Sequence, residues 1–101
     1  MTILGKAVSQ NGVSIRLTTE RWSHIVEAHD YMAGLHEWVL TAIAEPDFIA
    51  KGWESSLIAI QHLLETPLGE KHVIVVYREV TEDDGFVITA FMTSNVRKVP
   101  G

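Results

Sequence analysis

The chain has 101 residues, with 8 Lys and Arg against 13 Asp and Glu, a net charge of −5 and no cysteine. Disulfides and thiolate metal sites are excluded, and the charge argues against broad, non-specific nucleic-acid binding, which needs clustered basic groups. This length predicts one domain over 1–101, with its core at about 13–94 and a flexible tail over 95–101. No apolar run reaches the roughly 20 residues that span a bilayer, and no signal-peptide core is present, so we expect a cytoplasmic protein without a membrane partner.

The N-terminal third predicts a hairpin followed by a helix. Asn11-Gly12 separates residues 6–10 from 13–17 and predicts a type I′ turn, because both residues tolerate positive φ. Thr18 and Thr19 are N-cap candidates, and a helix of about three turns should follow until Gly34 interrupts it. Its apolar stripe has helical spacing: Trp22, Ile25, Val26, His29.

A second helix has a more regular apolar stripe, which ends before Pro46 because proline disfavours the α conformation at the residue preceding it. The stripe consists of Leu35, Trp38, Val39, Ala42 and Ile43.

The remainder of the chain predicts strands. We expect a short strand at 47–51, then strands at 56–64, 71–80 and 86–93, with turns at 66–69 and 82–85. The strand at 71–80 is apolar on both faces and should be central. Short turns make consecutive strands antiparallel neighbours. The predicted fold class is therefore α+β: an N-terminal hairpin, two helices, and an antiparallel meander of about four strands packed on the helices.

Two histidines of the first helix are candidate catalytic groups. At 100° per residue, His29 lies within about 20° of Trp22, in the apolar stripe. It is either a core histidine bonded to a backbone carbonyl or an acid–base group at the edge of a cleft. His24 lies about 160° from Trp22, and is either simply exposed or catalytic. If the helix packs by one face only, the two cannot point into one pocket.

The last strand and two arginines complete the candidate site. Alternation places Val87, Thr89, Phe91 and Thr93 on an open face, and Phe86, Ile88, Ala90 and Met92 toward the helices. The threonines are ordinary strand residues or hydroxyl donors at the floor of a cleft. Arg78 and Arg21 could bind phosphate, since guanidinium matches its geometry. The histidines lack metal-ligand spacing and the chain lacks a glycine-rich phosphate loop, so we expect no metal and no cofactor.

A family resemblance links these residues to RNA chemistry. Residues 20–25 (ERWSHI) with His29, and then 45–49, 71–77 and 85–94, resemble small phage and bacterial domains of the Barnase–EndoU–Colicin E5/D–RelE-like nuclease fold. The resemblance covers most of 19–94 and implies a metal-independent ribonuclease, in some members a toxin or effector. It implies that the helix histidines, His24 and His29, and the strand hydroxyls, Thr89 and Thr93, carry activity. The family often has Pro-Glu after the second histidine, where this chain has Asp30-Tyr31.

Two hypotheses follow. The first is an endoribonuclease, with RNA as partner, in which a histidine transfers the proton of the attacking 2′-hydroxyl while Arg21 or Arg78 stabilises the phosphorane. The second is a catalytically silent interaction module on the same fold, either a homodimer or one partner of a toxin–antitoxin-like pair. The negative charge and Trp53, which falls outside any apolar period, motivate the second hypothesis.

Overall fold

The computed structural model describes residues 2–95, so most of the segment expected to be a flexible tail lies outside the described residues. Every expected helix and strand is found, most within about two residues of the predicted bounds, although β1 begins three residues before the expected strand and the first helix ends at Ala28, well before Gly34. In chain order the elements are β1 (Ile3–Val8), β2 (Ser14–Thr18), α1 (Thr19–Ala28), the 3-10 turn η1 (Asp30–Met32), α2 (His36–Ala44), β3 (Phe48–Lys51), the 3-10 turn η2 (Trp53–Ser55), β4 (Leu57–Leu63), β5 (Lys71–Glu79) and β6 (Gly85–Thr93). No helix within residues 2–95 is long and apolar enough to cross a membrane.

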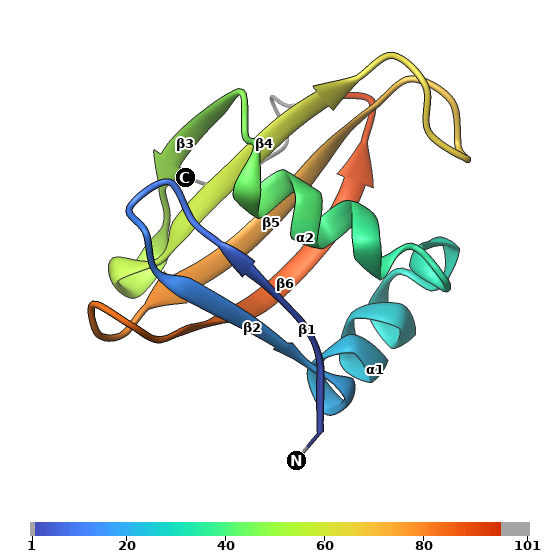
Figure 1. The fold of residues 1–101 in the computed structure, drawn as a ribbon. Helices are drawn as coiled ribbons and strands as arrows, with labels where there is room; N and C mark the ends of the chain where they lie inside the picture. Colours follow the sequence, from blue (N-terminus) through green and yellow to red (C-terminus); the bar gives the residue numbers. More distant parts are fainter. Residues whose placement is uncertain (1, 96–101) are drawn as a thin grey trace.

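One six-stranded sheet, in the order β1-β2-β6-β5-β4-β3, forms the frame of the molecule (Figure 1). The α+β class is confirmed, and β3 to β6 form the expected antiparallel meander with β5 inside it. The expectation of an antiparallel sheet of about four strands is wrong, because the hairpin joins the same sheet through parallel pairing of β2 with β6. Ile15 and Leu17 of β2 are fully buried, so docking the hairpin on β6 covers apolar surface as well as a sheet edge.

The turn between β1 and β2 differs from the predicted type I′ turn. Ser9 N–H donates to Val13 O at 2.9 Å, and Gly12 N–H donates to Ser9 O at 2.9 Å, so the loop holds three residues rather than two. Gly12 alone takes a positive φ, +81°, within this loop. This is the other common hairpin geometry, in which a turn is followed by a left-handed glycine.

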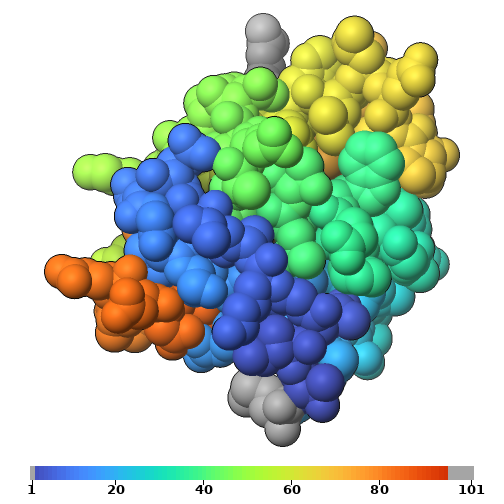
Figure 2. Space-filling view, in the orientation of Figure 1, coloured from blue at the N-terminus to red at the C-terminus, as the bar shows by residue number. Residues whose placement is uncertain are grey.

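Helix α2 lies across one face of the sheet, which we call the inner face, and helix α1 lies beside β6 (Figure 1). The α2 helix ends at Ala44, two residues before Pro46, as predicted. Figure 2 shows this side of the molecule as a continuous surface made by the hairpin, α2 and the α1–η1 segment. Beneath it lies the main core, whose fully buried members include Ile15, Leu17, Val39, Ile43, Val73, Val75 and Ala90.

The opposite, outer face has a composition of its own. A small apolar cluster of Ile58, Ile60 and Ile74 lies at its centre, with Val76 and Phe91 packed against it. Around this cluster the strands present polar and aromatic side chains. The outer face is the surface on which most of the candidate site residues lie.

A β-bulge in β6 corrects the predicted alternation of that strand. Val76 pairs with Thr89 and Tyr77 pairs with Val87, so Ile88 is an extra residue without an opposite partner. Beyond the bulge, Thr89 and the later residues face as predicted. Before it the faces are exchanged: Val87 is buried in the main core, whereas Phe86 faces outward.

Candidate functional site

Helix α1 packs beside β6, and separate cavities lie near the two ends of that strand. Strand β2 pairs with β6 through Ile15↔Gly85 and Arg16↔Phe86, the two pairs at the start of β6, and α1 packs against β6 beyond them. At the far end the Tyr31 hydroxyl donates to Met92 O at 3.1 Å. Residues of α1 and η1 therefore follow β6 from its first residues to its last, and side chains from both line one continuous edge.

His29 lies at this edge, outside the helical stripe in which the sequence placed it. The α1 helix ends at Ala28, and His29 is its C-cap, with φ −137° and ψ 76°. That departure from helical geometry turns the imidazole onto the outer side of β6. Its ring stacks on Phe91 at 5.4 Å with an interplanar angle of 28°, and meets the Tyr31 ring edge-on at 5.9 Å. His29 is half-buried in an aromatic setting rather than sealed in the core.

The two threonines flank the aromatic partner of His29. Thr89 and Thr93 lie two residues before and after Phe91 on the same face of β6. Thr93 Oγ1 accepts a hydrogen bond from Asn95 N–H at 3.1 Å. Thr89 lines a cavity of about 280 Å³ beside Trp53. The structure thus brings His29, Thr89 and Thr93 to one surface; of the two alternatives for His29, it matches the one at the edge of a cleft rather than the core histidine.

His24 is separated from this group. Its side chain is 66% exposed, and its nearest charged neighbour is Glu27, with Nδ1 and Oε2 4.0 Å apart. The helical wheel had placed His24 on the side opposite the apolar stripe, and the exposure agrees with that placement. Of the two histidines, His29 alone shares a surface with the threonines.

The arginines lie at the other end of β6, around Phe86. Arg16, Phe86 and Arg78 are in register on three adjacent strands, and both guanidinium groups lie over the Phe86 ring, at 5.7 and 6.0 Å from its centroid. Arg16 is paired with Asp84, and Arg78 has Glu54 at 3.8 Å. The two cations of this row are therefore each held by a carboxylate.

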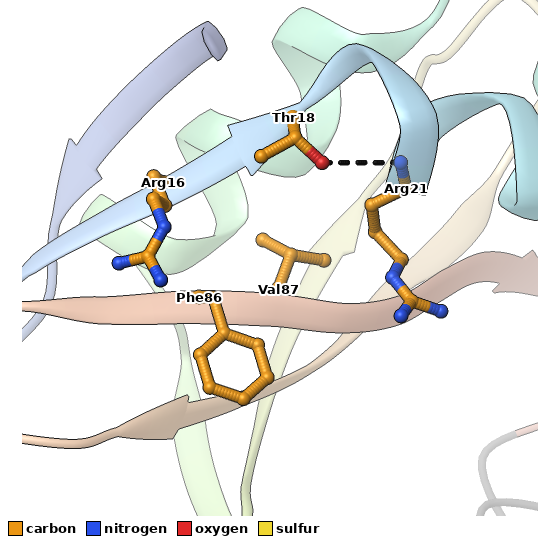
Figure 3. A pocket seen from close by; sticks show the side chains of 5 residues that line it. All are labelled: Arg16, Thr18, Arg21, Phe86 and Val87. Carbon is orange, nitrogen blue, oxygen red and sulfur yellow. Dashed lines mark hydrogen bonds between the residues drawn. The ribbon is translucent and has the colours of Figure 1, made fainter. Parts of the chain in front are cut away.

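Arg21 reaches the same region from the first turn of α1. Together with Arg16, Thr18, Phe86 and Val87 it lines a cavity of about 210 Å³ (Figure 3). Thr18 is the N-cap and accepts from Arg21 N–H at 3.1 Å, which fixes the start of the helix beside the cavity. In Figure 3 the Arg16 and Arg21 guanidinium groups lie on either side of the Phe86 ring.

These two groups of residues do not form one compact centre. Arg21 and His29 are eight residues apart, a backbone rise of about 12 Å at the helical spacing, with His29 as the C-cap. Arg21 and Arg78 lie beside Phe86, whereas His29 and Thr93 lie near the end of β6. The hypothesis that an arginine and a histidine act on the same phosphate stays a prediction.

Sequence reasoning did not single out four further residues. Arg16 alternates with buried Ile15 and Leu17, which is the signal that it faces outward. His72 shares the outer face with Arg78 by the same alternation; it pairs with Thr93 and stacks on His62 at 4.5 Å. Tyr31 and Lys71 line a cavity of about 380 Å³ next to His29. Tyr31 and Lys71 come together because the η1 turn follows α1, and no sequence pattern predicted that turn.

Within residues 2–95, no three His, Asp or Glu side chains lie close enough together to hold a metal ion. His62 and His72 stack on each other, and His62 Nε2 lies 2.7 Å from Glu70 Oε2.

Comparison of the chain with protein-family models, with curated proteins and with solved structures found no match.

Proposed function

We propose that this chain is a metal-independent endoribonuclease whose active centre is His29, on the outer edge of β6. The observation that carries the proposal is the position of the imidazole: half-buried, stacked on Phe91 and on the same face as Thr89 and Thr93. An imidazole can take and return protons at neutral pH. The resemblance of residues 20–29 and 85–94 to the nuclease fold supports the same assignment.

The reaction would be transesterification at a phosphodiester. His29 takes the proton of the 2′-hydroxyl, a bond forms between the 2′-oxygen and phosphorus, and the bond from phosphorus to the 5′-oxygen breaks. The leaving oxygen takes a proton from an acid, for which His72 is the candidate because it faces the same surface and pairs with Thr93. The products are a 2′,3′-cyclic phosphate and a 5′-hydroxyl, so no external reactant is consumed.

The aromatic residues have a separate role in this proposal. Bases of single-stranded RNA stack on aromatic side chains, with about 1–3 kcal/mol per base. Phe86 and Phe91 face outward on the same strand, and Trp53 is 78% exposed beside Thr89. A single strand lying along β6 would find stacking partners on either side of the reacting phosphate.

The test is cleavage of a fluorescent single-stranded RNA in the presence of EDTA, with DNA of the same sequence as the substrate that lacks the 2′-hydroxyl. His29→Ala should lower the rate by about 10²- to 10⁴-fold, the usual contribution of an acid–base group. His24→Ala, on the exposed side of the same helix, should leave the rate unchanged. Cleavage of the DNA, or normal cleavage by His29→Ala, would show that the mechanism is wrong.

A second candidate function, an interaction module, is favoured by one other observation. Trp53 is 78% exposed and Phe48 is 53% exposed. The backbone of η2 holds Trp53 outward with positive φ at Glu54 and Ser55, 51° and 65°. Such strained positions concentrate at functional surfaces. Light scattering over a concentration series tests self-association: a dimer that dissociates in Trp53→Ser supports this function, and a monomer at every concentration argues against a homodimer.

A further inference from the structure

We propose that the cavity between Arg16 and Arg21 is a binding site for a backbone phosphate of single-stranded RNA, distinct from the phosphate that reacts at His29. The identity of the ligand as RNA rests on the proposed function. The existence of an anion site rests on the cavity itself.

The first argument is charge. Within residues 2–95, the Arg16 guanidinium is paired with Asp84, and Arg78 faces Glu54. The Arg21 guanidinium has no hydrogen-bond or ion-pair partner among these residues, although it lines the same cavity. Three arginines thus face two carboxylates, and the surplus positive charge is that of Arg21. An anion entering the cavity would pair with it without displacing an existing partner.

The second argument is the fixed geometry of Arg16. Its Nη1 donates to Asp84 and, at 3.3 Å, to Gly85 O, while its guanidinium lies over Phe86. These contacts hold the guanidinium plane in one orientation, so little side-chain entropy remains to be lost when an anion binds. A guanidinium presents paired N–H groups that match the oxygens of a phosphate.

The third argument is size and position. The cavity of about 210 Å³ is smaller than the roughly 300–1,000 Å³ of sites that enclose drug-sized ligands, so it suits a phosphate group rather than a whole nucleotide. Helix α1 begins behind it at Thr19, and a helix N-terminus carries a partial positive charge. Glu20 lies in the same turn and opposes that charge, which leaves Arg21 as the principal attraction.

The fourth argument is the distance to the proposed active centre. Arg21 and His29 are eight residues apart, a helical rise of about 12 Å, and the cavity lies beside Phe86 whereas His29 stacks on Phe91, so we assign the phosphate held by Arg21 to a different position from the one attacked near His29. The site would instead hold the strand at a flanking position. It predicts that the protein binds strands long enough to reach both positions better than short ones that reach only His29.

Binding is tested with 2′-O-methyl oligonucleotides, which cannot be cleaved because they lack the 2′-hydroxyl. An eight-nucleotide strand should bind Arg21→Ala at least about tenfold more weakly than the unmodified protein, since a charge-assisted hydrogen bond to the phosphate is lost. The slope of log K against log salt should fall by about 0.7, the value for one phosphate contact in a single strand. Arg21→Lys should bind with intermediate affinity.

The matched control is Lys51→Ala, which removes the same charge from the exposed end of β3, three strands away from β6. If Arg21→Ala and Lys51→Ala lose affinity and salt slope equally, the subsite is wrong, whereas cleavage at His29 can still stand. The affinity lost in Arg21→Ala should be larger for the eight-nucleotide strand than for a two-nucleotide strand, which cannot reach both positions at once; equal losses would contradict two separate phosphate positions.

Inorganic phosphate separates failure of the site from failure of the proposed function. In amide NMR spectra, phosphate should shift the resonances of Arg16, Thr18 and Arg21 in the unmodified protein but not in Arg21→Ala. If those shifts appear while RNA is neither bound nor cleaved, the anion site stands and the ribonuclease proposal fails. If phosphate causes no shift there and RNA binds equally to Arg21→Ala, the anion site is overturned.

Discussion

The inner and outer faces of the sheet are built from the same strands but from different chemistry. On the inner face β5 and β6 present Val73, Val75 and Ala90, all fully buried beneath the helices. On the outer face the alternate positions of these strands include Arg78, His72 and Thr93. Because successive side chains of a strand point to opposite faces, the same strands supply buried core residues to one surface and polar residues to the other.

The outer face also has an apolar part, so the two faces do not differ simply as apolar and polar. Ile58, Ile60 and Ile74 are buried on it and contact Phe91, the residue on which His29 stacks. Because the cluster packs against Phe91, it restricts the ring that positions the imidazole. The difference between the faces is therefore one of proportion: aliphatic packing dominates the inner face, whereas on the outer face a few aliphatic residues support polar and aromatic ones.

The largest expected effect on stability comes from truncating a buried side chain of the inner face. Ile43 of α2 is fully buried, so Ile43→Ala removes packed methyl groups and leaves a cavity, which should lower the free energy of unfolding by about 2–5 kcal/mol. Phe48, at the outer edge, is 53% exposed, and Phe48→Ala should cost much less. Urea denaturation of both variants measures the difference. Equal losses would show that the outer face contributes to stability as strongly as the inner face.

A smaller effect is expected where the hairpin joins the meander. A Cβ on Gly85 would lie 2.6 Å from Ile15 Cδ1 and closer still to the carbonyl oxygen of Arg78. The carbonyl belongs to the backbone and cannot turn away, so Gly85→Ala should cost about 1–3 kcal/mol of unfolding free energy.

Gly85→Ala also tests whether phosphate binding on the outer face depends on the junction of β2 with β6. Separating β2 from β6 moves Arg16 away from Phe86, so phosphate binding should weaken together with stability. The control is Gly69→Ala, in the exposed β4–β5 turn, where strain at φ +90° also costs stability but the arginines are untouched. A Gly85→Ala variant that folds with normal stability would show that the β2–β6 junction can relax.

Much of this fold could be predicted from the sequence, because each element carried a local signal. Thr18 caps α1, Pro46 follows the end of α2, and the apolar run of β5 lies inside the sheet, as periodicity and capping predicted. The parallel pairing of β2 with β6 had no such signal. It joins residues about 70 positions apart. The β6 edge and the apolar surface that β2 covers exist only once the sheet has formed.

The candidate site was predictable in part for the same reason. Alternation correctly placed Thr89 and Thr93 on the outer face, but Ile88 forms a bulge that reversed the assignment of Phe86. The helical wheel correctly separated His24 from the apolar stripe, but it assumed that the helix continues through His29, whereas α1 ends one residue earlier. A single non-helical residue changes a side chain's direction, and the wheel contains no information about where a helix ends.

The smallest expected effect concerns Tyr77, the polar side chain that the inner face buries completely. Its hydroxyl has no hydrogen-bond partner within residues 2–95. Burial, with a further contribution from the charge of Glu79, raises the pKa of Tyr77 from 10.0 to about 12. Because the unfolded chain releases this proton first, stability is full below about pH 10 and falls as pH rises toward 12.

Tyr77→Phe removes both the unpaired hydroxyl and this titration. Near pH 7 it should be neutral or stabilising by up to about 1 kcal/mol, because no hydrogen bond is lost. The comparison variant is Tyr31→Phe at the outer edge, which loses the bond to Met92 O and should be destabilised by a similar amount. Urea midpoints at pH 7 and pH 11 measure both effects. If Tyr77→Phe is destabilised at pH 7, the hydroxyl has a partner that supports the inner face, and the contrast between an aliphatic inner face and a polar outer face is weaker than described. If Tyr77→Phe loses as much stability at pH 11 as the unmodified protein, the loss comes from groups other than Tyr77.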